Sequence, residues 1–363
     1  MNSISLKSIK PLHYMLLAFP AALAGSLLRW NPLLNFVLAC LGLVPLAELI
    51  GEATEALAVV TGPQIGGLLN ATLGNAAELI ITLVAIRAGL LDLVKASITG
   101  SIIGNLLLVL GGSVLAGGLK HGRQRFSHEG AATNGTSLAL AVMALAVPSL
   151  FNHTLGGSAL PPRLLEDISL GVALVMIVLY VFGLIFRLRA SRAPRARPEP
   201  DAAAIVEPAR WSVRTSVIIL ALATGAVVLL SEILVESVAP VTAALGLSQF
   251  FLGIILIPII GNVAEHLVAI EVALKNKIEL SLEIALSSSQ QIALFVAPVL
   301  VLVSQPFPHR LNLVFNQFEL VALIAAVGIS ALVAADGETN WLEGAQLLGV
   351  YLILAVAFFF VKS

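Results

Sequence analysis

Two short stretches of the chain place a carboxylate behind the same Gly-Asn pair, 187 residues apart. GNAAELI occupies 74–80 and contains Glu78, and GNVAEHL occupies 261–267 and contains Glu265. Both stretches lie inside long apolar runs. A charged side chain at the centre of a bilayer costs roughly 2.5–3.5 kcal/mol on insertion scales, so it is tolerated where it faces a partner, a water-filled cavity or an ion. This repeated arrangement predicts a cation site.

Other oxygen-bearing side chains fall at helical spacing around the two carboxylates. Asn75, Glu78 and Thr82 share one helix face, as do Asn262 and Glu265. The apolar runs that follow contribute hydroxyl and amide groups at similar spacing. The predicted ligands are Gly74, Asn75, Glu78, Ser101, Gly261, Asn262, Glu265, Ser288 and Gln291. Such oxygen ligands favour a hard cation such as Ca²⁺, Mg²⁺ or Mn²⁺ over zinc or copper.

The glycine before each Asn has two interpretations. Gly74 and Gly261 weaken the helix one turn before each carboxylate, and a helix interrupted at matching points in two halves releases backbone carbonyls as ion ligands. Alternatively, these small residues only allow neighbouring helices to pack closely. The full pattern Gly-Asn-x-x-Glu, because it occurs twice, favours the ion site.

Two facing carboxylates also indicate which ion drives the process. An empty charged pair is unfavourable in a low-dielectric interior, and either one divalent cation or protons can neutralise it. Burial and like-charge repulsion favour protonation of the empty site. Cation and protons then compete for the same oxygens, which amounts to exchange, with a stoichiometry that the residues leave open.

Further polar groups in the apolar runs form a possible proton or cation path: Glu48, Glu52, Glu55, Asn105, Glu232, Glu236 and His266. The alternative for these acids is a position at the wet end of a helix. His266 is either a proton relay, since histidine titrates near neutral pH, or a hydrogen-bonded neighbour of Glu265. Glu319 and Glu343 lie near the ends of apolar runs and are interpreted as packing or interface groups.

The composition predicts membrane-spanning helices, and these helices must position the polar groups. The 363 residues are 58% hydrophobic and 11% charged, with a mean hydropathy of +1.00. A bilayer crossing needs about 20 apolar residues and, apart from closed barrels, only helices satisfy their backbone in lipid. We therefore expect an all-α polytopic membrane protein with about eleven spans: 12–28, 33–60, 64–89, 91–117, 131–149, 165–188, 213–239, 247–274, 279–303, 311–334 and 341–361.

An internal repeat organises these spans. A shift of 187 residues superposes the two Gly-Asn-x-x-Glu patterns and places Ser101 on Ser288. Each unit has five spans, an odd number, so the two copies are inverted in the membrane, as in secondary transporters. The expected domains are 1–31 with the first helix, 32–189 as the first five-helix repeat, a linker at 190–212, and 213–363 as the second repeat.

Charge distribution sets the expected orientation. With the N-terminus in the cytoplasm, fourteen of the twenty Lys and Arg residues fall on the cytoplasmic side, and the C-terminus lies outside. The linker is rich in Pro, Ala and Arg and reads as a mobile connection whose arginines are a topology signal or, alternatively, contact lipid headgroups. A net charge of −1 does not suggest nucleic-acid binding.

At this point the sequence resembles a known family. GNAAELI, GNVAEHLVAI, SITGSIIGNLLLVLG at 97–111 and ALSSSQQIALFVAPVLV at 285–301 are similar to motifs of the calcium/proton antiporters of the CAX type, within the cation/Ca²⁺ exchanger superfamily. The resemblance implies Ca²⁺ transport driven by protons, Glu78 and Glu265 as ion-binding acids, sliding second and seventh helices, and a homotrimer. The short loops and the absence of targeting extensions favour a multi-pass protein of a prokaryotic plasma membrane, with a vacuolar membrane as the alternative.

The alternatives are a Na⁺-driven Ca²⁺ exchanger, which Gln290 and Gln291 argue against, and a broader antiporter of divalent cations such as Mn²⁺. An inverted repeat argues against a channel with a continuous pore. The chain lacks a His-x-x-x-His pattern or similar ligand set for an intramembrane metalloenzyme. We therefore expect a transporter rather than an enzyme, with Ca²⁺ and H⁺ as transported ions and no cofactor.

Overall fold

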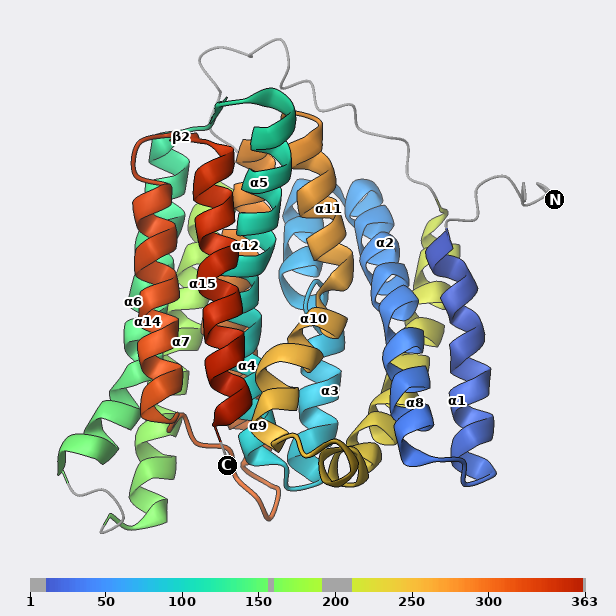
Figure 1. Ribbon diagram of the computed structural model, residues 1–363. Coiled ribbons are helices and arrows are strands. Elements are labelled where there is room, and N and C mark those ends of the chain that lie inside the picture. The colour runs from blue at the N-terminus through green and yellow to red at the C-terminus, as the bar shows by residue number, and fades with distance from the viewer. Residues whose placement is uncertain (1–10, 156–159, 191–210, 362–363) are drawn as a thin grey trace. The chain divides into compact units, whose positions relative to one another are not determined.

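A computed structural model of the chain describes residues 11–155, 160–190 and 211–361 (Figure 1). Lys7 and Lys10 lie outside the described residues, as does nearly all of the predicted linker at 190–212.

The first half of the chain forms helices joined by short loops. In chain order its elements are η2 (Pro11–Leu17), α1 (Ala18–Leu27), α2 (Pro32–Leu73), α3 (Ala76–Arg87), α4 (Leu91–Ile103), η3 (Gly104–Val109), α5 (Leu110–His121), β1 (Gln124–Arg125), α6 (His128–Leu155) and α7 (Pro162–Ala190).

The second half of the chain also forms helices joined by loops. Its elements are α8 (Val213–Leu245), α9 (Gln249–Phe251), η5 (Leu252–Leu256), α10 (Ile257–Gly261), α11 (Val263–Leu274), α12 (Ile278–Gln291), η6 (Ile292–Val296), α13 (Ala297–Ser304), α14 (Gln317–Val333), β2 (Glu338–Thr339) and α15 (Trp341–Phe360).

Helix length and hydropathy confirm a polytopic all-α membrane protein. Within the described residues seven helices are long and apolar enough to cross a bilayer, or eight if the bent pair Gln249–Gly261 and Val263–Leu274 is one span. Two other expected spans correspond to shorter apolar helices, Tyr14–Leu27 and Gln317–Val333. The window 64–89 is divided between the end of α2 and α3. The total of eleven spans therefore stays a prediction.

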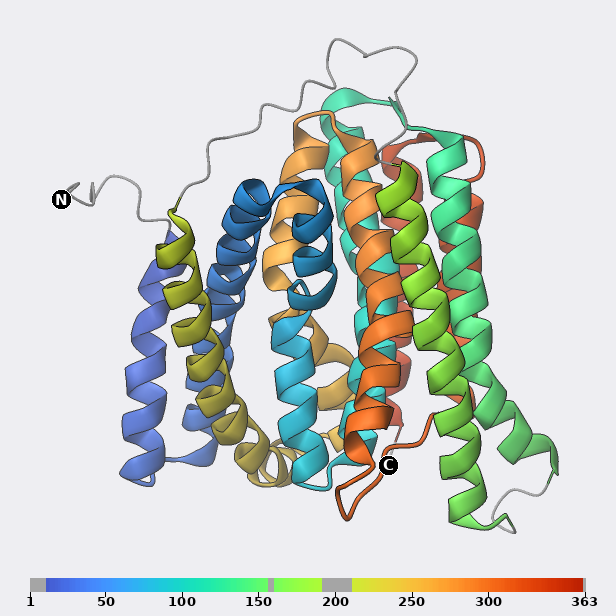
Figure 2. The same cartoon turned by 180° about the vertical axis from the view of Figure 1, so that it is seen from behind.

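The chain divides into two compact units that each draw on both halves of the sequence. One comprises Met1–Val84 and Arg195–Leu247, and the other Ala85–Pro194 and Ser248–Ser363. The expected second and seventh spans, α2 and α8, therefore belong to the same unit, where they pack along each other (Figure 2). This division crosses the predicted repeats, and the boundaries at 32–189 and 213–363 stay a prediction.

Within the first unit, α2 bends where the expected second span ends. Gly62 has φ +82° and ψ 172° inside α2, a left-handed conformation that side chains rarely adopt. Pro63 follows, and its ring disfavours a helical conformation at the preceding residue. The sequence window ending at residue 60 is thus consistent with a real break in the helix.

In the second unit, small residues bring helices into close contact. A Cβ at Gly100 on α4 would collide with the Ile254 carbonyl oxygen, and one at Gly253 would lie 2.7 Å from the Leu93 oxygen. Gly111 on α5 and Gly344 on α15 make a similar approach (Figure 1). Close backbone approach at Gly is a common way for membrane helices to pack.

Loop contacts define two opposite ends of the second unit. At one end, β1 and β2 pair in antiparallel register, and Arg123 lies 3.1 Å from Glu338. At the other end, Ser149 Oγ accepts a hydrogen bond from the Phe315 amide at 2.8 Å. The two-residue strands were not predicted from the sequence, because they lie in loops and have no strand-length periodicity.

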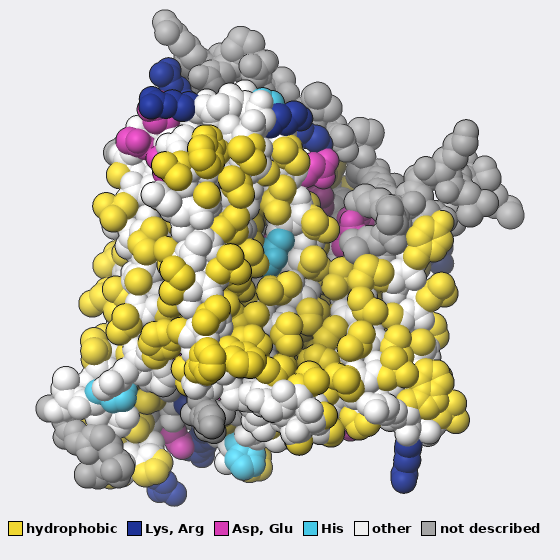
Figure 3. Space-filling model, viewed as in Figure 1, with side chains coloured by type: hydrophobic (Ala, Val, Ile, Leu, Met, Phe, Trp, Pro, Cys, Tyr) yellow, Lys and Arg dark blue, Asp and Glu magenta, His cyan; other side chains and the backbone are white. Residues whose placement is uncertain are grey.

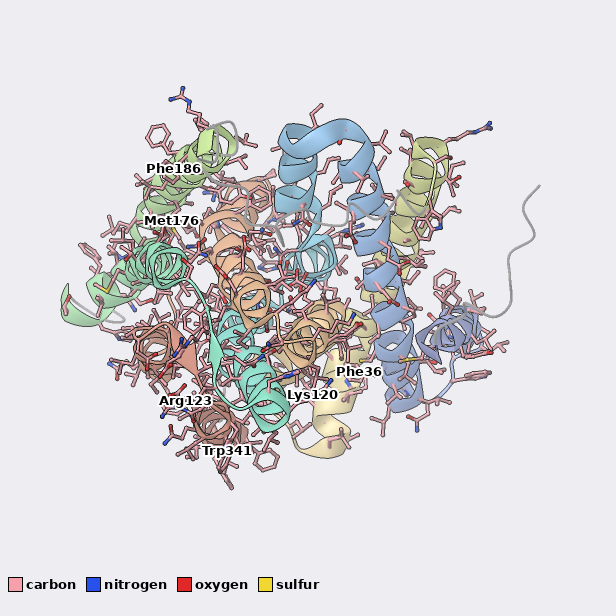
Figure 4. All side chains as sticks on the ribbon, turned by 90° about the horizontal axis from the view of Figure 1, so that it is seen from above. Phe36, Lys120, Arg123, Met176, Phe186 and Trp341 are labelled. Atoms are coloured by element: carbon pink, nitrogen blue, oxygen red, sulfur yellow. The ribbon has the colours of Figure 1, made fainter. Side chains whose placement is uncertain are left out.

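The surface of the second unit follows the membrane interpretation. Hydrophobic side chains cover the visible middle of α14 and α15, whereas charged side chains gather toward the helix ends (Figure 3). Lys120 and Arg123 lie at the end seen from above, on the last turn of α5 and in the loop after it (Figure 4). These groups are therefore available to loops and headgroups rather than to the apolar middle.

Candidate functional site

The second Gly-Asn pair marks a sharp break in the eighth expected span. Helix α10 ends at Gly261, α11 begins at Val263, and the helical segments on either side meet at 59°. Asn262 between them has φ −105° and ψ 7°, outside the helical region. Pro258 lacks a backbone N–H, and Gly261 disfavours a continuous helix, so the local sequence accounts for the interruption. The predicted break is confirmed here.

The side chain of Asn262 is held by hydrogen bonds from its nitrogen, and its oxygen has no hydrogen-bond donor among the described residues. Its Nδ2 donates to Ser101 Oγ at 3.2 Å and to the Pro258 carbonyl oxygen at 3.0 Å. Because an amide nitrogen has two hydrogens, these contacts use both of them. Asn262 Oδ1 is buried and accepts no hydrogen bond from any described residue. The orientation of the amide therefore leaves its buried oxygen without a donor among the described residues.

A hydrogen-bonded relay reaches Glu265 from α12 and η3. Asn105 Nδ2 donates to Ser288 Oγ at 3.0 Å, and the Ser288 hydroxyl in turn hydrogen-bonds to the Glu265 carboxyl group. The Ser288 oxygen accepts from Asn105, so the Ser288 hydroxyl is the donor to the carboxylate. The structure thus brings together Asn105, Ser288 and Glu265, three residues that the sequence proposed on separate helices.

Glu265 has little else to neutralise it. Its Oε2 is buried and accepts no hydrogen bond within the described part of the chain. Among the described residues no Lys or Arg forms an ion pair with it. A carboxylate in such surroundings is stable when it is protonated or when a cation binds to it.

The first Gly-Asn pair lies in the other compact unit and makes a milder interruption. Helix α2 ends at Leu73 and α3 begins at Ala76, with Gly74 and Asn75 in a turn between them. Glu78 is in the first turn of α3, and only 4% of its surface is exposed. This predicted break is also confirmed.

The predicted neighbours of Glu78 on its helix are buried with it. Asn75 and Thr82 are both almost fully buried, and Thr82 Oγ1 donates to the Glu78 carbonyl oxygen at 2.6 Å. The expected shared face of Asn75, Glu78 and Thr82 is therefore turned away from solvent.

Matching π-helical segments follow the predicted ligands of α4 and α12. Gly104–Val109 and Ile292–Val296 are both π-helical and lie at equivalent points of the predicted repeat. Asn105 is in the first segment, and Gln291 immediately precedes the second. A π turn contains an extra residue and is frequent at functional sites, because it re-aims the side chains around it.

The other predicted path residues differ in burial. Glu48 and Glu52 are half-buried on α2, whereas Glu55, Glu232 and Glu236 are exposed.

His266 is half-buried, and among the described residues it forms no hydrogen bond with Glu265. The interpretation as a hydrogen-bonded neighbour of Glu265 is therefore wrong. Because consecutive helix residues point about 100° apart, the two side chains leave α11 in different directions.

The two acids interpreted as packing groups do act as helix caps. Glu319 forms a capping box with Asn316 at the start of α14, and its Oε1 accepts from Thr99 at 3.0 Å. Glu343 forms the equivalent box with Asn340 at the start of α15. Both carboxylates are thus assigned to helix ends.

Sequence reasoning missed two polar contacts close to the site. Ser330 Oγ on α14 donates to the Leu106 carbonyl oxygen at 3.2 Å, inside the π-helical segment that contains Asn105. Gln290 Nε2 donates to the Asn134 carbonyl oxygen at 2.7 Å. The sequence does not indicate the partners of Ser330 and Gln290, because these contacts depend on the packing of helices from distant segments.

Comparison with known proteins places this geometry in a family. The family model described as sodium/calcium exchanger protein matches residues 31–189 and 215–360. The chain belongs to the sodium/calcium exchanger family. A Ca²⁺/H⁺ antiporter of Aphanothece halophytica is 43% identical over 357 residues, covering 95% of each chain. The Ca²⁺/H⁺ antiporter ChaA of Bacillus subtilis is 43% identical over 344 residues, covering 94% of this chain and 96% of its own.

Solved structures agree with this assignment. The structure of native YfkE matches with a TM-score of 0.84 and 39% identity, covering 96% of this chain and all of that one. The crystal structure of an H⁺/Ca²⁺ exchanger CAX matches with a TM-score of 0.67 at 16% identity, which shows a shared fold. This member of the exchanger family is an integral membrane protein.

Proposed function

We propose that this chain is a secondary transporter that exchanges cytosolic Ca²⁺ for protons across a membrane. The observation that carries the proposal is similarity along nearly the whole chain to proteins named Ca²⁺/H⁺ antiporters, at 43% identity. The repeated Gly-Asn-x-x-Glu pattern supports it, because it supplies oxygen ligands suited to a hard cation.

In this proposal Glu78 and Glu265 each bind the transported cation, one from each repeat. The support differs between them. Glu265 and Asn262 each have a buried oxygen without a hydrogen-bond donor among the described residues, as expected of groups waiting for a cation or a proton. Glu78 is proposed from its equivalent place in the repeat and from its burial.

Exchange follows from competition between the ions. A bound divalent cation neutralises the carboxylates and displaces protons, and protonation of the carboxylates releases the cation. Transport then requires access to the ligands from alternate sides of the membrane, as inverted-repeat transporters achieve. We place α2 and α8 among the moving elements because the resemblance assigns that role to the second and seventh spans.

We also propose the membrane, the orientation and the oligomeric state of the transporter. We infer a multi-pass protein of a prokaryotic plasma membrane, with the N-terminus in the cytoplasm and the C-terminus outside. The distribution of Lys and Arg supports this orientation. A homotrimer is proposed from the resemblance alone.

The proposed function is tested by ⁴⁵Ca²⁺ uptake into inverted membrane vesicles with an imposed pH gradient. Vesicles acidified inside should accumulate Ca²⁺, and dissipating the gradient should stop uptake. A parallel set of vesicles with a Na⁺ gradient tests the alternative that the family description raises. Uptake driven by Na⁺ and indifferent to the pH gradient would contradict proton exchange. Competition by Mn²⁺ in the same vesicles tests the broader selectivity.

A further inference from the structure

The C-terminal end of α11, the helix that contains Glu265, is held by side chains from the last turn of α5 and from the segment after it. Lys120 Nζ and His121 Nε2 donate to the Leu274 carbonyl oxygen, at 3.0 and 2.8 Å. Gln124 Nε2 donates to the Ala273 carbonyl oxygen at 3.2 Å. The Leu274 carbonyl is one of the last carbonyls of the helix, which have no partner within the helix, so Lys120 and His121 satisfy it. The Ala273 carbonyl also accepts a hydrogen bond from the Asn276 amide at 3.0 Å, so Gln124 is a second donor to it. Lys120 also complements the negative end of the helix dipole.

Gln124 is the buried member of this group. Its side chain is 2% exposed, and its Nε2 also donates to Asn276 Oδ1 at 2.9 Å, just beyond the end of α11. A Cβ at Gly117 would collide with Gln124 Oε1, so the absence of a side chain at Gly117 makes room for the amide. Gln124 therefore joins α5 to both α11 and the turn after it.

The segment that contains Gln124 is itself fixed. Gln124 pairs with Thr339 in the two-stranded sheet, and Arg123 on one side and Arg125 on the other both contact Glu338. These contacts connect the segment to the start of α15. A displacement of Gln124 would therefore break several interactions at once, so it is a firm anchor for α11.

The anchor acts on Glu265 through the helix between them. Helix α11 has twelve residues, which corresponds to about 18 Å of regular helix. Its other end is the bend at Asn262, where the chain changes direction by 59°. A short helix moves as a rigid rod, so holding its C-terminal end fixes how far Glu265 reaches toward Ser288.

We propose that Gln124 is a positioning residue for Ca²⁺ binding, which anchors α11 so that Glu265 is held at its hydrogen-bonding distance from Ser288. This inference rests on the proposed function of Glu265 as a cation ligand. Gln124 does not touch the cation in this account, and its effect is on how well the site is organised before the cation arrives.

The test replaces Gln124 with Met, which has a similar length and no hydrogen-bonding amide. Purified full-length protein is measured by equilibrium ⁴⁵Ca²⁺ binding, and reconstituted protein by exchange. We expect the apparent Kd to rise about tenfold and the KM for Ca²⁺ to rise with it, while the maximal rate stays within about twofold. A general loss of folded protein would lower the maximal rate without raising the KM.

A matched control is available in the same compact unit. Gln305 also donates its amide to the carbonyl of a helix end, Val301 on α13, at 3.0 Å. Gln305→Met should therefore remove a similar hydrogen bond and leave Ca²⁺ affinity within about twofold of the unsubstituted protein. An equal loss of affinity in both variants would contradict a specific role for Gln124.

A second variant keeps the test decisive if Gln124→Met does not fold. Asn276 has φ +60°, so Asn276→Gly removes the acceptor of Gln124 and keeps the backbone conformation. We expect a loss of Ca²⁺ affinity of about threefold for this exposed position. Unchanged affinity in Asn276→Gly, together with unchanged affinity in any folded Gln124→Met, would overturn the inference.

The same measurements separate the two proposals. Absence of Ca²⁺ binding by the unsubstituted protein, or full binding by Glu265→Gln, would reject the proposed site. Binding that is lost in Glu265→Gln but unaffected in Gln124→Met would reject only the positioning role. Combining Gln124→Met with Ser288→Ala should cost less than the sum of the single changes, because both act on the placement of Glu265.

Discussion

Glu265 combines two properties that bear on its charge. It accepts a hydrogen bond from Ser288, which stabilises the ionised carboxylate, and it has a buried oxygen to which no described residue donates. The first property favours a charge at this position, and the second leaves that charge incompletely compensated. The residue is therefore suited to alternate between a bound cation and a proton.

We expect Glu265→Gln and Glu78→Gln each to abolish Ca²⁺ exchange while the protein still inserts and folds. Glutamine keeps the side-chain volume but removes the charge that neutralises a divalent cation. The control is Glu271→Gln, which changes an exposed carboxylate on the same helix, paired with Lys275 at 2.6 Å. Uptake of ⁴⁵Ca²⁺ in vesicles measures all three. Near-normal uptake by either site variant would remove that carboxylate from the site.

Two adjacent serines on α12 make different contacts, so substituting each of them distinguishes a role in the site from a role in packing. Ser288 hydrogen-bonds to Glu265, whereas Ser289 Oγ donates to the Ala285 carbonyl oxygen of its own helix at 2.9 Å. We expect Ser288→Ala to weaken Ca²⁺ binding about tenfold, as loss of a hydrogen bond to a charged group implies. Ser289→Ala should bind normally. Equal affinities in equilibrium binding would show that the relay does not support the cation.

At the scale of elements, close helix packing brings Ser101 on α4 to Asn262, which lies between α10 and α11. The backbone of α4 approaches η5 so closely at Gly100 that no side chain fits, and the next residue, Ser101, accepts a hydrogen bond from the amide of Asn262. The helix break thus depends on its neighbour for orientation as well as on its own sequence.

We expect Gly100→Ala to destabilise the folded protein by about 1–3 kcal/mol, because its Cβ would collide with backbone rather than with a movable side chain. Gly104→Ala is the control, since a Cβ there has open space around it. Thermal unfolding of the purified proteins in detergent measures the difference. Identical midpoints would contradict the close approach of α4 and η5.

The sequence predicts the helices and the breaks better than it predicts their contacts. The Gly-Asn pairs predict both helix breaks because Gly and Asn are poor helix formers. The length of each apolar run predicts a membrane-spanning helix. The pairing of Asn105 with Ser288 depends instead on how two distant helices are rotated, which periodicity does not encode. The contacts of Gln124 depend on a loop, where no period exists. His266 shows the same limit, since adjacency in sequence wrongly suggested a hydrogen bond to Glu265.

At the scale of the whole molecule, the loops of the second unit lie at two opposite ends. Helices that cross a membrane in alternating directions place their connecting loops in this way. The loop after α5 contacts the turn after α11 and the strand before α15, all at one end. Arg310, in the loop after α13, lies 3.4 Å from Glu166 at the start of α7, at the other end. Contacts between loops support an alternating topology but leave open which end faces the cytoplasm.

Orientation is tested by labelling single cysteines from either side of intact cells. Cys40, the one native cysteine, is first replaced by Ala. We expect Lys277→Cys to react only after the membrane is permeabilised, and His309→Cys to react with a membrane-impermeant reagent added outside, because positive loops stay in the cytoplasm. The reverse pattern would invert the proposed topology.

The central claim is that Ca²⁺ and protons compete for the same carboxylates, and equilibrium binding measures it most directly. Purified protein is titrated with ⁴⁵Ca²⁺ from about pH 5.5 to 8.5, a range in which buried carboxylates can exchange protons. Proton release is followed in weakly buffered solution. We predict that the apparent affinity for Ca²⁺ falls as the pH falls, and that each addition of Ca²⁺ releases protons. An affinity independent of pH, with no proton release, would contradict the shared site.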